Sequence, residues 1–163
     1  MSKGEEARGL MVVLERSRAA LMEAIAGLDE EGFRRRAAAG EWNAAEALAH
    51  LLAHEQRMLL LARTALTEDN PSVQSRGEAQ QLEEAKAAQR MPVPQIVHGL
   101  LAQRRDTLLA LEPLSQQQLA RTIQHSRMGE MTVGGLVLRI VHHETEHAGQ
   151  IVSMRQQPAG AAT

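Results

Sequence analysis

The chain has 163 residues and a formal net charge of −2, with one tryptophan, one phenylalanine, no tyrosine and no cysteine. This length suits a single domain, which we expect over residues 1–157, followed by a flexible tail over residues 158–163. The lack of cysteine excludes disulfides and thiolate metal ligands, and the mixed charges show no footprint for nucleic-acid binding. Without a signal peptide or an apolar run near the ~20 residues of a membrane span, we expect a cytoplasmic protein.

The apolar residues are mainly Leu, Ala, Val, Ile and Met, which favour packed helices over a β-sandwich. Leu10, Leu14 and Leu21 repeat at helical spacing, and this stripe predicts a first helix over residues 5–28. Three consecutive arginines follow at residues 34–36. We interpret them as a solvated face, with anion binding as the alternative.

The second helix is predicted over residues 44–67. Asn43 is a favourable N-cap, and Glu46 three residues later completes a capping-box pattern. His50 and His54 are four residues apart and lie on or beside the apolar stripe of this helix. Both imidazoles are therefore expected on the face that packs against other helices.

The rest of the chain predicts two more core helices and two connections. Residues 78–90 have helical propensity but little to bury, so we expect a peripheral helix or a mobile excursion. The third core helix is predicted over residues 95–111, and residues 121–130 are expected to form a polar connection. Thr132 is a good N-cap for the fourth helix, over residues 133–156. With no strand signal, the predicted fold is an all-α four-helix bundle.

The fourth helix carries the most informative pattern. His143, Glu144 and His147 match H-E-x-x-H, and two histidines four apart share one helix face, where they can bind one divalent metal. The alternative is two histidines that bond to backbone or water. Because burial of two imidazoles in an apolar bundle costs free energy unless their nitrogens find partners, the spacing favours metal binding. His142 is rotated by about 100° from His143 and is expected to face outward or toward a neighbouring helix.

A zinc peptidase, the usual interpretation of H-E-x-x-H, does not fit. No His, Asp or Glu follows His147, and the extended peptidase pattern fails because Gln150 and Ser153 stand where glycine and histidine are required. A third ligand must come from upstream. On their positions alone, His50 and His54 are both candidates, whereas His98 and His125 are expected to be solvent-exposed.

These features together resemble the DinB/YfiT-like metal-binding proteins. The resemblance covers residues 10–155, and no single part of it is specific by itself. It rests on the order and spacing of several residues across the predicted helices, namely Trp42, His50, Leu51, Pro94, Thr132, Leu136, His143, His147, Gly149 and Gln150.

Membership of this family implies an up-down-down-up bundle, often dimeric, in which three histidines hold zinc or nickel. Transferred to this chain, the ligands are His50, His143 and His147. Characterised relatives include bacillithiol S-transferases and a mycothiol-dependent maleylpyruvate isomerase, and others resemble metal-dependent hydrolases. The family name refers to damage-inducible genes, so a role in stress or DNA damage is also implied.

We therefore predict a metal-dependent transferase that activates a low-molecular-weight thiol, in a homodimer without membrane or nucleic-acid partners. The alternatives are a non-catalytic stress-related binding protein and a metal-dependent hydrolase. Glu144 and His54 are candidate catalytic residues, and Gln150 is a candidate polar wall of the pocket. Basic residues at 34–36 or 104–105 are candidates for contact with an acidic cosubstrate.

Overall fold

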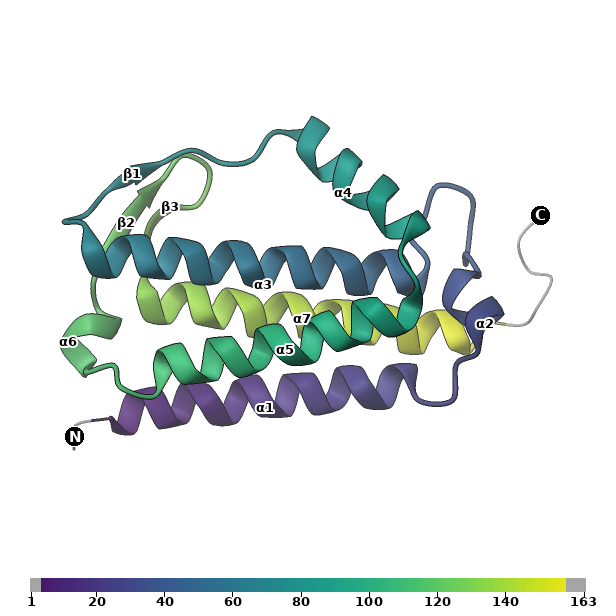
Figure 1. Ribbon diagram of the computed structural model, residues 1–163, viewed down its shortest axis with the longest axis horizontal. Coiled ribbons are helices and arrows are strands. Elements are labelled where there is room, and N and C mark those ends of the chain that lie inside the picture. The colour runs from purple at the N-terminus through teal and green to yellow at the C-terminus, as the bar shows by residue number, and fades with distance from the viewer. Residues whose placement is uncertain (1–3, 158–163) are drawn as a thin grey trace.

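Four long helices form the body of the protein (Figure 1). The computed structural model describes residues 4–157, so the tail predicted over residues 158–163 lies outside the described residues. The long helices are α1 (Glu5–Ile25), α3 (Ala44–Thr67), α5 (Val93–Leu111) and α7 (Val133–Arg155). In Figure 1, α1 and α7 run in one direction while α3 and α5 run in the other, which is the expected up-down-down-up order. The predicted four-helix bundle is confirmed.

Local capping signals set the helix boundaries. The Asn43 side chain accepts a hydrogen bond from the backbone of Glu46, whose side chain accepts from the backbone of Asn43, so the predicted capping box begins α3. The hydroxyl of Thr132 likewise caps α7 by accepting from the Gly135 backbone. The first helix ends three residues earlier than predicted, because Gly27 has a φ of 77°.

The chain between the parallel neighbours α3 and α5 must return along the bundle, and it does so as an excursion. This excursion contains strand β1 (Ser72–Val73) and the peripheral helix α4 (Glu78–Arg90), in which Ala88 is the only buried residue. Two short helices, α2 (Glu30–Arg34) and α6 (Gln116–Leu119), occupy other connections. The helix expected over residues 78–90 is therefore present.

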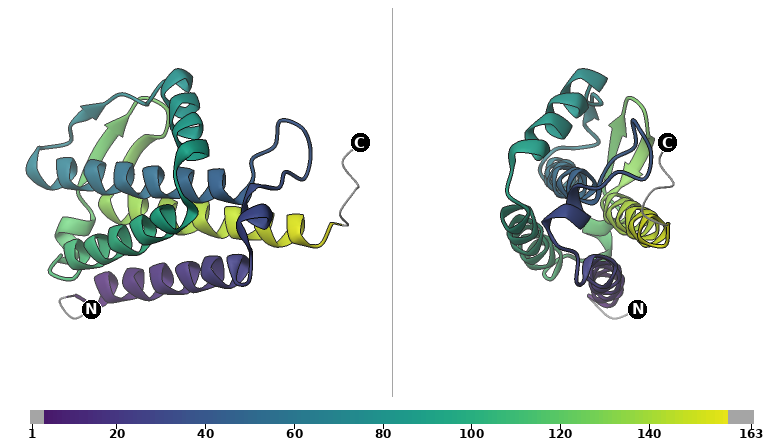
Figure 2. Two further views of the ribbon diagram at one scale, coloured as in Figure 1. Left: turned by 45° about the vertical axis from the view of Figure 1, so that its right-hand side comes forward. Right: turned by 90° about the vertical axis from the view of Figure 1, so that its right-hand side faces the viewer.

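The expectation of no strands was wrong. Strands β2 (Thr122–His125) and β3 (Gly129–Thr132) form an antiparallel hairpin, and β1 pairs parallel with β2. Ile123 is fully buried between half-buried neighbours. The polar residues around it concealed the strand, and its pairing with β1 joins segments about 50 residues apart, which no local pattern reveals. Seen end-on in Figure 2, the strands lie beside α3 and α7.

The interior consists of two apolar clusters separated by a polar layer. One cluster surrounds Leu14, Met58 and Ile140, and the other surrounds Leu21 and Leu51. In each long helix, buried polar residues stand between the residues of one cluster and those of the other. They include Ser17, Arg18, Glu55, Arg104, Thr107 and Glu144. No helix within residues 4–157 is both long enough and apolar enough to cross a bilayer.

Candidate metal centre

Three histidines from two helices meet on the surface shared by α3 and α7. His50 comes from α3, while His143 and His147 lie one turn apart on α7. One ring nitrogen from each lies within 4.8 Å of the others. The Nε2 atoms of His50 and His143 are 2.6 Å apart, and the ring centroids of His50 and His147 are separated by 5.4 Å. The structure thus brings together the three predicted ligands.

Burial keeps these imidazoles in the form that binds metal. Desolvation, followed by repulsion from neighbouring histidines, lowers the pKa of His50 and of His143 to about 4. Burial also lowers the pKa of His147, although contact with Gln150 acts in the opposite direction. Neutral imidazole is the ligand form of histidine, so no proton has to leave these side chains near neutral pH.

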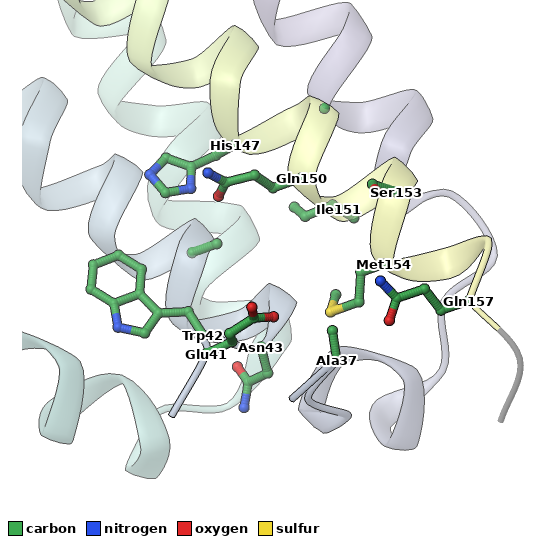
Figure 3. Close-up of a pocket in the computed structure, with 12 residues that line it drawn as sticks. Ala37, Glu41, Trp42, Asn43, His147, Gln150, Ile151, Ser153, Met154 and Gln157 are labelled. Atoms are coloured by element: carbon green, nitrogen blue, oxygen red, sulfur yellow. The ribbon is translucent and has the colours of Figure 1, made fainter. Parts of the chain in front are cut away.

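A second observation, at Nδ1 of His147, also fits a divalent metal bound by the three histidines. Nδ1 of His147 is buried without any hydrogen-bond partner among the described residues, an arrangement that costs free energy in a protein interior. Figure 3 shows the Gln150 amide beside this ring. If Nε2 holds a metal, Nδ1 carries the proton, and a rotated Gln150 amide can accept it in a hydrogen bond. Three histidine nitrogens suit zinc and nickel among other ions.

Trp42 forms an aromatic wall of the cluster. Its ring stacks on His147 with a centroid distance of 6.0 Å and an interplanar angle of 10°, and it meets His50 edge-on at 4.7 Å. The side chain is 40% exposed. Asn43, which caps α3, follows Trp42 directly in the chain, so the start of this helix also positions the wall of the site.

His54 lies beside the three-histidine cluster. Its ring centroid is 4.3 Å from that of His143 and 6.4 Å from that of His50, but its nitrogens are not among the three that converge. Desolvation and nearby His143 lower the pKa of His54 to about 3. The side chain is therefore a neutral part of the pocket wall, and its catalytic role stays a prediction.

Glu144 points into the bundle and takes no part in lining the pocket around the histidines. Its carboxylate accepts hydrogen bonds from Ser17 Oγ at 2.8 Å, from Arg18 Nε at 3.0 Å and from Arg104 Nη2 at 3.1 and 3.2 Å. The residue is 1% exposed. This position is structural, and the predicted catalytic role of Glu144 has no support in its contacts.

The same contacts define a buried charge network that sequence analysis did not predict. Glu55 accepts hydrogen bonds from Arg18 Nη2 at 3.0 Å, from Arg104 Nε at 2.9 Å and from Thr107 Oγ1 at 2.8 Å. Burial alone would lower the pKa of Arg104, but its hydrogen bonds with Glu55 and the charge of Glu144 raise it. Two guanidiniums and two carboxylates thus join all four long helices through balanced charges.

Four of the five arginines considered for contact with an acidic cosubstrate bind other residues of the chain, whereas Arg105 is exposed. Arg34 donates to backbone oxygens of Ala88 and Met91, and Arg35 donates to that of Met154. Arg36 pairs with Glu46, and Arg104 belongs to the buried network. The solvated face expected for residues 34–36 holds only for Arg36, which is exposed, whereas Arg34 and Arg35 are half-buried. All three side chains tie α2 and its connection to α3, α4 and α7.

His125 also differs from its expected solvation. It is only 9% exposed, and its Nδ1 accepts hydrogen bonds from the backbone N–H groups of Arg127 and Met128. These bonds close the turn between β2 and β3. His98 and His142 are exposed as expected.

Two cavities adjoin the histidine cluster. One, of about 660 Å³, is drawn in Figure 3 and lies beyond Trp42 and His147 toward Gln150 and Met154. The other, of about 730 Å³, contains all three candidate ligands together with His54. Residues of the excursion between α3 and α5 and of the β2–β3 hairpin also line this second cavity. The two connections therefore build a wall over the ligand-bearing face of α3 and α7.

The fold and site define a helical bundle protein with a cluster of three histidines that could hold a metal ion. Residues 13–151 match the DinB superfamily, and the chain belongs to that family. The structure is similar to YfiT from Bacillus subtilis, described as a probable metal-dependent hydrolase with an unusual four-helix bundle topology. The TM-score is 0.77 at 19% identity, with 97% of this chain and 91% of YfiT covered.

A second similar structure is TT2238, a four-helix bundle protein. Its TM-score is 0.56 at 20% identity, with 90% of this chain and 98% of that chain covered. No curated protein matches the sequence. The structural similarities establish the fold, while the three-histidine cluster is a property of this chain's own residues.

Proposed function

We propose that this protein binds a divalent metal, zinc or nickel, through His50, His143 and His147 and transfers a low-molecular-weight thiol to an electrophile. The observation that carries the proposal is the convergence of three neutral imidazoles on one face of an accessible cavity. A bound divalent ion supplies Lewis acidity, which stabilises the anionic form of a thiol or of water near neutral pH.

The protein's own side chains prepare the cavity for this chemistry. Trp42 packs against His50 and His147 and limits solvent access from one side. His54, held neutral beside His143, can accept a hydrogen bond from an incoming group. The buried network under the site fixes the helices that carry these residues. A homodimer, a cytoplasmic location and a stress-related role remain predictions.

Metal binding is tested by elemental analysis of protein purified without added metal, followed by titration with Zn²⁺ and Ni²⁺. We expect His50→Ala and His147→Ala each to weaken binding by at least about 100-fold, since even loss of an outer partner costs about 10–100-fold. His98→Ala is the matched control, because His98 is exposed on α5 outside the cavity. Wild-type affinity in both ligand variants would disprove the three-histidine site.

A metal-dependent hydrolase is the second candidate, favoured by the description of YfiT. The two activities are separated by turnover of one generic electrophile by the metal-loaded protein, with and without bacillithiol. Turnover that requires the thiol supports a transferase, whereas turnover in water alone supports a hydrolase. Binding of metal without either turnover would favour the non-catalytic alternative.

A further inference from the structure

The larger cavity beside the histidines has a basic wall that the proposed function does not yet use. Four arginines line it, namely Arg57, Arg76, Arg127 and Arg139, against the two carboxylates of Glu84 and Glu146. Arg76 is paired with Glu84. The remaining guanidiniums therefore face the cavity with little compensating negative charge.

Two of these arginines lie one helical turn from the histidines. Arg57 follows His54 by three residues on α3, and Arg139 precedes His143 by four residues on α7. Residues three or four apart on a helix are neighbours on one face, with Cβ atoms ~5–6 Å apart. Each ligand-bearing helix thus places a guanidinium at the edge of the metal centre.

The arginines converge on one region. Arg57, Arg127 and Arg139 all act electrostatically on His125, whose pKa is lowered by burial and by these charges. Arg57 donates to the backbone oxygen of Gln74. Arg127 and Arg139 are exposed, and their guanidinium groups make no hydrogen bond or ion pair with any residue in the described part of the chain. Their donors are available to a ligand.

We propose that the substrate or cosubstrate of this site is an anion whose carboxylate, phosphate or sulfonate group is held by Arg127 and Arg139 while its reacting end reaches the histidine centre. Guanidinium groups bind such oxyanions through paired hydrogen bonds, and a cavity lined by one sign of charge concentrates ligands of the opposite sign. This inference rests on the proposed function for the reacting end, but the anion preference is testable without metal.

The metal-free test uses Trp42, the only tryptophan in the chain and a wall of the same cavity. Its fluorescence is quenched with iodide and with caesium at constant ionic strength. We expect iodide to quench about two- to threefold more than caesium relative to free tryptophan. This ratio corresponds to a local potential of about half a kT per unit charge, because the potential raises the local concentration of iodide and lowers that of caesium by the same factor. The preference for iodide is expected to fall in the double variant Arg127→Gln/Arg139→Gln. It is expected to persist in the control Arg105→Gln, because Arg105 is exposed outside the cavity.

The metal-loaded test uses Co²⁺ protein and the absorption of its thiolate complex. Three thiols of similar size are compared: 3-mercaptopropionate, 2-mercaptoethanol and cysteamine. We expect the anionic thiol to bind about tenfold more tightly than the neutral one and the cationic thiol to bind least, with the differences lost in Arg127→Gln/Arg139→Gln. Arg139→Glu is expected to favour cysteamine.

The outcomes separate the two proposals. Equal quenching by iodide and caesium, or equal binding of the three thiols, overturns the anion site and leaves thiol activation standing. An iodide preference that depends on the two arginines, without binding of any thiol to the cobalt protein, supports the anion site and refutes thiol activation. Both preferences together support the anionic thiol as the substrate class.

Discussion

In two pairs of consecutive residues, one member faces a cavity and the other faces the interior of the bundle. The two members belong to two contrasting regions of the molecule. His54 and Glu55 are consecutive on α3, as are His143 and Glu144 on α7. Because successive residues on a helix are about 100° apart, the histidines line a cavity while the glutamates enter the bundle. The same turns of the same helices therefore carry both the candidate metal centre and the buried charge network.

The two regions differ in how completely their polar atoms are satisfied. Each carboxylate oxygen of Glu55 and Glu144 accepts two hydrogen bonds, and the network contains two positive and two negative groups. The histidine cluster has a nitrogen on His147 without a hydrogen-bond partner among the described residues, and its rings disfavour a proton on one another. A fully hydrogen-bonded network keeps its side chains in one arrangement. A cluster with an unsatisfied polar atom is stabilised when a ligand binds and supplies the missing partner. We infer that the first region fixes the geometry that the second needs.

The largest expected effect is the loss of stability when the network is broken. Glu144→Ala leaves Arg18 and Arg104 buried with a single carboxylate between them, and we expect a loss of about 3–5 kcal/mol in the free energy of unfolding. The measurement is urea denaturation of metal-free protein. Glu146→Ala is the matched control, because Glu146 is exposed two residues along the same helix. Comparable small losses in both variants would contradict a structural role for Glu144.

The next largest expected effect is a loss of metal affinity, and it tests the histidine cluster instead of the buried network. Gln150→Leu removes the only amide that Figure 3 places beside Nδ1 of His147. We expect Zn²⁺ affinity to fall by about 10–100-fold with little change in the stability of the metal-free protein, as for other outer partners of metal-bound histidine. Gln150→Glu keeps an acceptor and should restore binding. An unchanged affinity in Gln150→Leu would leave Nδ1 without an assigned partner.

The helices and the histidine pair were predictable because their signals are local. Asn43 with Glu46 marked the start of α3, Thr132 marked the start of α7, and the spacing of His143 and His147 placed both on one face. The choice of His50 over His54 as third ligand came from the family resemblance, since both lie on one helix face and only the packing of α3 against α7 separates them.

The buried network was not predictable in the same way, because its partners come from four helices. Arg18 stands between Leu14 and Leu21, where a long charged side chain is normally assigned to solvent. The basic wall of the cavity was also missed, although Arg139 and Arg57 stand one turn from His143 and His54. That spacing could have predicted that Arg57 and Arg139 lie near the histidines. Arg76 and Arg127 reach the same cavity only because the excursion and the hairpin fold over it.

The smallest expected effect is the pH dependence that the histidine cluster contributes to stability. His50 and His143 have a pKa of about 4 in the folded protein, against 6.5 for an unperturbed histidine. Between these values the unfolded chain binds more protons than the folded one, so the stability present above pH 6.5 is lost as the pH falls toward 4. Allowing for partial solvent exposure, we expect a loss of roughly 1–2 kcal/mol. Urea denaturation of metal-free protein at pH 7, 6 and 5 measures it, and His50→Gln should flatten the slope while His98→Gln leaves it unchanged. Equal slopes in wild type and His50→Gln would place the acid sensitivity outside the histidine cluster and weaken the contrast between the two regions.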